Sequence, residues 1–152
     1  MRRKDREQTA EFAWDVLARC PYGVLSLVDD DGLPYAVPVS PAALDGAVYF
    51  HAAKHGAKAK LMAGGAPACL VVVDDVVPLP EEYATEYASG VFRGPVSEVT
   101  DEAEKIAALR AIVEHYAAEN LAGFQAAIDD ELKRTAVWKI SPTEVTGKAR
   151  LA

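Results

Sequence analysis

The sequence predicts a mainly β protein, an antiparallel barrel with helices around its periphery. Six segments have the residue patterns of strands, and most of them are joined by short turns. Helical patterns occur only at the start of the chain, after the third strand and before the last one, which disfavours the regular alternation of a doubly wound sheet. The 152 residues contain no internal repeat and no Pro/Gly/Ser linker, so we expect a single domain over residues 1–152.

The first third of the chain has the pattern of a helix, a hairpin and a further strand. Thr9 is suited to cap a helix that Pro21 would end. The acidic turn Asp29–Gly32 joins the first two of three strand patterns, which cover residues 23–28, 35–39 and 47–51. Three prolines punctuate the second of these strands: Pro34, Pro38 and Pro41. Because proline lacks the N–H that a ladder needs, we expect this strand at an edge, a bulge or a barrel corner.

The rest of the chain mixes strands and helices. A short helix at 57–63 ends in two glycines, and the apolar run 68–73 is typical of a strand buried on both faces. Residues 74–86 contain Pro78 and Pro80 among polar and aromatic residues, so we expect a loop long enough to act as a lid. The last predicted elements are a strand at 87–99 bent by glycine and proline, a helix from the capping box of Asp101 and Glu104 to 117, a helix at 121–132 and a strand at 135–140.

The overall charge excludes several classes of partner. Sixteen basic and 23 acidic residues leave a net charge of −7, which disfavours binding to nucleic acid or to an anionic membrane. No apolar run is long enough to span a bilayer. The basic start Met1–Arg6 is followed by Glu7 and Gln8 instead of the apolar segment of a signal peptide, so we expect a cytoplasmic protein. Cys20 and Cys69 are then expected to be free thiols.

The charge is distributed unevenly along the chain. Between Asp45 and Asp74 there are three lysines and no acidic residue, so this stretch carries +3 and the remainder carries −10. Its basic run, 51–60, passes from a strand end through Gly56 into a helix. Free N–H groups at such a turn, together with lysines and small residues, suit a phosphate or another anion. A solvated basic helix face is the alternative interpretation.

Other chemistries lack their motifs. His51 and His55 are four residues apart, but no glutamate lies between them and His51 ends a strand, so we expect no metal site. The chain has no Gly-x-Ser-x-Gly, no complete Walker A loop and no Gly-x-Gly-x-x-Gly. Acyl transfer and these two modes of nucleotide binding are therefore not expected.

Five groups of residues, in this order, carry a family resemblance. They are Met1–Arg6, Val37-Pro38-Val39, Asp45-Gly46-x-x-Tyr49-Phe50-His51-x-Ala53-x-x-Gly56-x-Lys58, Tyr87-x-Ser89 and Thr146-Gly147-Lys148. The chain resembles the 5-nitroimidazole reductase (Nim-like) branch of the pyridoxamine 5′-phosphate oxidase-related flavoproteins. The resemblance implies a six-stranded split β-barrel that forms a homodimer and holds FMN between its subunits.

The resemblance also implies a set of site residues. Lys58 and the turn of Ala52, Ala53 and Lys54 would hold the FMN phosphate. Four residues would line the isoalloxazine ring: Val37, Pro38, Val39 and Ser40. His51 would lie beside the flavin and the substrate as the catalytic residue, and Lys148 would approach from the C-terminal segment. The chain departs from the family pattern at Ala52, where serine is frequent, at Tyr83, where tryptophan is common, and at Gly90, where a β-branched residue is usual.

The resemblance, together with the basic turn, leads us to expect an FMN-dependent oxidoreductase that reduces a small electron-poor acceptor such as a nitroimidazole or another nitroaromatic. The flavin would supply the redox chemistry, and the protein would supply binding and a proton donor. Two alternatives stay open: a deazaflavin-dependent reductase on the same barrel, and a non-catalytic protein that binds a flavin or haem.

Overall fold

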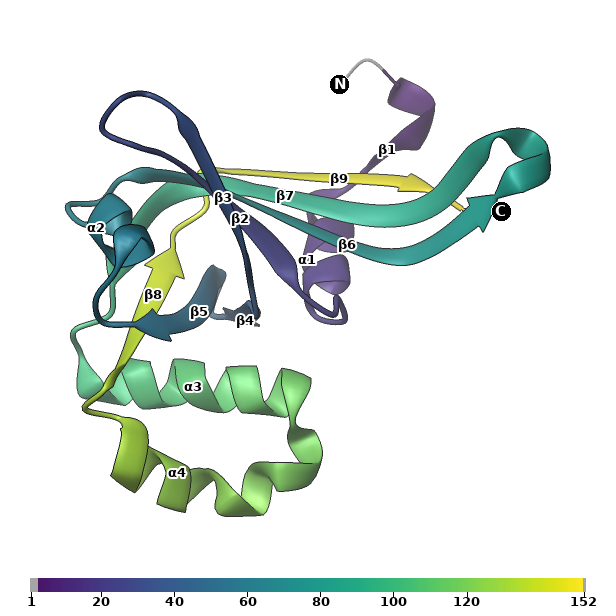
Figure 1. Ribbon diagram of the computed structural model, residues 1–152. Helices are drawn as coiled ribbons and strands as arrows, with labels where there is room; N and C mark the ends of the chain where they lie inside the picture. Colours follow the sequence, from purple (N-terminus) through teal and green to yellow (C-terminus); the bar gives the residue numbers. More distant parts are fainter. Residues whose placement is uncertain (1–2, 152) are drawn as a thin grey trace.

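The protein is an antiparallel split barrel, formed by a sheet that bends without closing on itself (Figure 1). The structure is a computed structural model, and it describes residues 3–151. Over these residues nine strands are paired, in the order β3-β2-β6-β7-β8-β5-β4, with β9 added to β7 and β1 added to β9. The mainly β prediction is confirmed, and β3, the strand with the prolines, lies at one end of the strand order.

The six strands predicted from the sequence are all present, and three short or late strands were not predicted: β1, β4 and β9. The bounds are β1 Glu7–Gln8, β2 Gly23–Val28, β3 Pro34–Val39, β4 Ala42–Leu44, β5 Ala47–Ala53, β6 Pro67–Leu79, β7 Ala84–Glu98, β8 Thr135–Ile140 and β9 Glu144–Arg150. The largest omission is β9, because Ser141-Pro142 is a turn that returns the chain to the sheet rather than the end of the fold.

The strand β7 connects the two parts of the sheet. Most of its length pairs with β6 and β9, and its last residues, Val96–Glu98, pair with β8. The change of partner follows Gly94 and Pro95, where the sequence predicted a bend. At Gly94 the backbone of Ser141 occupies the space that a side chain would need. Glycine is required there because the two segments approach too closely for a Cβ atom.

The α-helices are α1 Ala10–Leu17, α2 Ala57–Met62, α3 Glu102–Tyr116 and α4 Phe124–Glu131. The 3-10 helices are η1 Lys4–Arg6, η2 Pro80–Glu82 and η3 Ala118–Gly123. Both predicted caps form. The amide of Phe12 donates to Thr9 Oγ1 at 3.1 Å, and the amide of Glu104 donates to Asp101 Oδ1 at 2.8 Å. None of the helices within residues 3–151 is long and apolar enough to cross a membrane, and Met1 and Arg2 of the basic start lie outside the described residues.

The main core lies between the sheet and α1. Trp14 of α1 packs edge-on against the buried Phe92 of β7, with ring centroids 4.7 Å apart. Gly90 permits this close packing, since a Cβ there would lie 3.0 Å from the carbonyl oxygen of Ala13. The departure at Gly90 from the family pattern therefore has a packing reason. On the other side, α3 covers the face of β5 and β8 through Ala108, which packs with Tyr49 and Val137.

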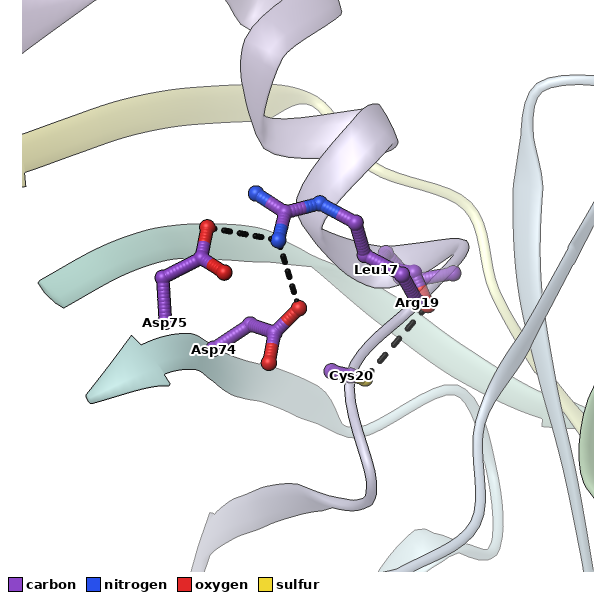
Figure 2. Close-up of polar contacts among 5 residues, drawn as sticks. All are labelled: Leu17, Arg19, Cys20, Asp74 and Asp75. Atoms are coloured by element: carbon purple, nitrogen blue, oxygen red, sulfur yellow. Dashed lines mark hydrogen bonds and ion pairs between the residues drawn. The ribbon is translucent and has the colours of Figure 1, made fainter.

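The predicted loop over residues 74–86 is wrong, because these residues form a hairpin. Strands β6 and β7 continue to Leu79 and Ala84 and extend beyond the rest of the molecule (Figure 1), with only η2 at the tip. Pro78 is tolerated because β6 pairs with β2 only through Cys69–Val72, which leaves its far end at an edge. Arg19 fixes the hairpin base by donating to Asp74 and Asp75 at 2.6 Å each (Figure 2).

Candidate functional site

The predicted phosphate turn lies between β5 and α2, next to the barrel. Ala52 is buried in the main core, whereas His51 and Ala53, its neighbours in the strand, are exposed on the opposite face. Lys54 and His55 then lead to Gly56, whose φ of 122° is accessible to glycine and strained for other residues. Since α2 has only six residues, positive charge at this turn comes mainly from the lysine side chains.

The three lysines of this segment differ in their partners. Lys60 lies 3.8 Å from the carboxylate of Asp30, and both side chains are largely exposed. Neither Lys54 nor Lys58 forms an ion pair with any residue from 3 to 151. Partial burial lowers the pKa of Lys58, which shows that its ammonium is desolvated without a counter-charge. A bound anion would supply that charge.

His51 lies on the side of the site that faces the helices. It lines a 190 Å³ pocket together with apolar residues of α3 and α4, among them Ile112 and Phe124. Surrounding protein atoms lower the pKa of His51, and the nearby charge of Lys58 lowers it further. The imidazole is therefore neutral at pH 7, with one nitrogen as a donor and the other as an acceptor. It can form a hydrogen bond of either kind with a ligand.

A 300 Å³ cavity opens on the other side of the turn. Its lining includes Lys54, the small residues Gly56 and Ala59, Glu98 at the end of β7, and Trp138 of β8. Trp138 is 4% exposed, and its Nε1–H has no hydrogen-bond partner within the described chain. An unpartnered buried donor is unusual in a native protein. Lys54 forms no ion pair among residues 3–151, not even with Glu98, so the region has two donors without a protein partner. Two such donors fit a phosphate-bearing ligand.

The proposed ring-binding segment is an edge strand. Val37 and Val39 pack toward the core, whereas Pro38 is exposed, and Ser40 follows the end of β3. Because β3 pairs only with β2 over residues 3–151, the backbone groups along its other edge have no ladder partner. This edge can therefore supply hydrogen bonds to the polar rim of a planar ring.

Lys148 lies apart from the other predicted residues. Its ammonium is 5.6 Å from the ring centre of Tyr87, and the hydroxyl of Ser89 donates to its carbonyl oxygen at 3.1 Å. In Figure 1 the C-terminal end of β9 and α2 lie at opposite ends of the long sheet. The structure thus groups His51, Lys54 and Lys58 around one turn and places Lys148 elsewhere on the same chain.

Two residues of the site were missed by sequence reasoning. Trp138 lies in the strand predicted at 135–140, but its burial and its unpartnered N–H depend on the tertiary structure. Glu98 is acidic and lies 38 to 47 residues from the basic run, so the charge pattern gave no reason to include it. Its position in the cavity follows from the pairing of β7 with β8.

Several solved structures resemble this one. A FAD and heme binding protein from Mycobacterium smegmatis matches with a TM-score of 0.82 and 21% identity, over 97% of this chain and 74% of the other. The flavocytochrome Anf3 from Azotobacter vinelandii matches with a TM-score of 0.75 and 20% identity, over 100% and 72%. A candidate 5-nitroimidazole antibiotic resistance protein from Bacteroides thetaiotaomicron matches with a TM-score of 0.74 and 19% identity, over 93% and 84%. At these identities the likeness establishes the fold.

Sequence comparison identifies the family. No curated protein matches the chain. The family described as pyridoxamine 5′-phosphate oxidase matches residues 9–149, a span that includes the basic turn, the β3 edge and Lys148. The chain therefore belongs to the pyridoxamine 5′-phosphate oxidase family.

Proposed function

We propose that the protein is a flavin-dependent oxidoreductase that holds the FMN unit of its cofactor at the turn between β5 and α2. The observation that carries the proposal is the pair of lysines at this turn, Lys54 and Lys58, which have no carboxylate partner among residues 3–151. Lys54 lines a cavity whose wall includes Trp138, a residue with a buried, unpartnered N–H. The similar structures from Mycobacterium and Azotobacter, which are described as flavin or flavocytochrome proteins, support a flavin as the ligand.

Each group of residues has a separate task in this proposal. Lys54 and Lys58 bind the phosphate as charge-assisted donors. The free edge of β3 orients the isoalloxazine ring, which supplies the redox chemistry when bound. His51, neutral at pH 7, donates a hydrogen bond through its one N–H to a small electron-poor acceptor such as a nitroimidazole.

The outer face of the sheet supports the homodimer that the family resemblance implies. The strand register places four residues in one row across four strands: Pro38, Val24, Val71 and Val91. Val73 is 38% exposed and Val28 is 57% exposed on the same face. An apolar sheet face of this kind is typical of a surface that binds a partner. We therefore propose a second copy as the partner, with the flavin covered at the interface.

The dimer can be tested by sedimentation at micromolar concentration. The Val71→Asp variant should sediment as a folded monomer, because a charge on each copy would face the apolar row of the other. The Thr85→Asp variant places the same charge on the hairpin away from this row and should remain dimeric. A wild-type monomer under these conditions would contradict the dimer.

The flavin proposal is tested by the visible spectrum of the purified protein and by mass analysis of the released ligand. We expect flavin absorbance, or its recovery when flavin is added. The Lys58→Ala variant should weaken flavin retention at least tenfold, since it removes a phosphate contact. The Arg134→Ala variant is the control and should change retention less than twofold, because Arg134 is paired with Glu131 at 2.7 Å and does not line the cavity at the turn.

Other outcomes would replace the proposal. A released ligand with the mass of a deazaflavin would indicate a deazaflavin-dependent reductase. A haem absorption band without any flavin would indicate a haem-binding protein. Flavin that is reduced anaerobically but never reoxidised by a nitroaromatic would indicate a binding role without turnover. Equal flavin retention by the Lys58→Ala and Arg134→Ala variants would show that the phosphate lies elsewhere.

A further inference from the structure

A second cleft of 560 Å³ adjoins the cavity at the phosphate turn. Lys54 and Glu98 line both spaces. From these two residues the cleft continues between the start of α3 and one side of α4, where Ile106 and Leu132 contribute apolar surface. A ligand whose phosphate lies at Lys54 could therefore continue into this cleft without crossing another element of the chain.

The cleft contains further positive charge. Lys105 and Lys133 line it, and neither forms an ion pair with a residue between 3 and 151. Lys105 Nζ donates to the carbonyl oxygen of Leu132 at 2.7 Å, which leaves it further donor capacity. Burial lowers the pKa of Lys105, and the charge of Lys54 lowers it further despite Glu98 and Glu102. Lys54 and Lys105 line the same cleft, so an anionic group bound there has both ammonium groups available as donors.

The other polar residues of the cleft restrict the kind of ligand. Three carboxylates line it, Glu98, Glu102 and Asp129, so a long polyanion would be repelled. Carboxylates are suitable acceptors for the hydroxyl groups of a ribose, as in dinucleotide-binding proteins. The apolar surface of Ile106 and Leu132 suits a flat base. Phosphate, ribose and base together are the parts of an adenosine 5′-phosphate.

We propose that the flavin is a dinucleotide, FAD, whose second phosphate binds between Lys54 and Lys105 and whose adenosine occupies the cleft between α3 and α4. This inference rests on the proposed function, because it keeps the FMN unit at Lys58 and extends the same ligand past Lys54. It assigns to α3 and α4 a role in cofactor selection in addition to covering β5 and β8.

The test compares the dissociation constants of FMN and FAD for the flavin-free protein, measured by the change in flavin fluorescence. We expect FAD to bind at least tenfold more tightly than FMN. The Lys105→Ala and Lys133→Ala variants should each weaken FAD binding by about fivefold to tenfold and change FMN binding less than twofold, because each removes a charged contact to the adenosine half. The Lys58→Ala variant should weaken both flavins, since both share the first phosphate.

Two controls make the result specific. Lys105 also links α3 to the end of α4, so the exposed Lys133 provides a variant that does not break that link. Arg134→Ala removes a nearby exposed charge that is paired with Glu131 and does not line the cleft, and it should leave both constants unchanged. Added AMP should displace FAD and leave FMN bound.

The outcomes separate the two proposals. Equal binding of FMN and FAD by the wild-type protein, or equal losses for both flavins in the Lys105 and Lys133 variants, would overturn the dinucleotide inference and leave the flavin function in place. If neither flavin binds, the proposed function fails and the inference fails with it.

Discussion

Gly147 provides a direct test of how α1 packs on the sheet. It lies in β9 within the Thr146-Gly147-Lys148 group, where a glycine could be read as part of a ligand site. In the structure, a Cβ built on Gly147 would lie 2.7 Å from the carbonyl oxygen of Thr9 and 3.0 Å from Cβ of Gln8. We therefore predict that Gly147→Ala destabilises the fold, because the start of α1 would have to move away from the sheet.

The size of the effect follows from the contact distances. The 2.7 Å separation is 0.7 Å below the 3.4 Å lower limit of an ordinary contact, and the opposing atom is backbone. Overpacking of this kind costs roughly 2–3 kcal/mol of unfolding free energy. For a chain of this length that corresponds to a fall in Tm of about 6–9 °C.

Urea denaturation followed by circular dichroism, at one fixed protein concentration, measures this change. Gly123→Ala is the matched control, since its Cβ would meet nothing within 4 Å and its φ of −86° suits alanine. That variant should have wild-type stability or gain up to about 1 kcal/mol. If Gly147→Ala were as stable as Gly123→Ala, the close approach of α1 to β9 would be incorrect.

Three further predictions concern charged groups. Arg19→Ala should loosen the base of the β6–β7 hairpin and lower the unfolding free energy by only about 0.5–1 kcal/mol, because the paired side chains are partly exposed. Amide hydrogen exchange should become faster in residues 74–86 and stay unchanged in β2. Lys139 and Tyr49 donate to Glu104 Oε1 at 2.8 and 2.7 Å, and these contacts lower the pKa of Glu104. The ionised carboxylate therefore stabilises the fold above the ordinary pKa of 4.5, and this contribution is lost as the pH falls through the lower pKa of the folded state. The unfolding free energies of the wild type and of Glu104→Gln should therefore converge at acidic pH. A gap that persisted at low pH would contradict this assignment. The NMR titration of His51 should give a pKa below the ordinary 6.5, and Lys58→Met should raise it because the charge of Lys58 is removed. An unchanged His51 titration would mean that Lys58 does not influence it.

The local elements of the fold were predictable because their causes lie within a few residues of sequence. Thr9 and Asp101 cap helices through amides three residues away. The side chain of Asp29 accepts from the amides of Asp31 and Leu33 and closes the predicted turn. The hairpin at 74–86 was missed because Pro78 and Pro80 suggest a break when neither the edge position nor the clamp from Arg19 is known.

Some features of the candidate site likewise follow from the sequence alone, and others follow only from the tertiary structure. The sequence by itself determined the basic run from His51 to Lys60, because a stretch without acidic residues is a property of the chain order. Only the tertiary structure decided that Lys60 is partnered by Asp30, that Trp138 leaves its N–H unpaired, and that Lys148 lies apart. Strand pairing brings together residues far apart in the chain, such as Ala53 and Thr135, and it thereby decides which charges are neutralised and where a cavity remains.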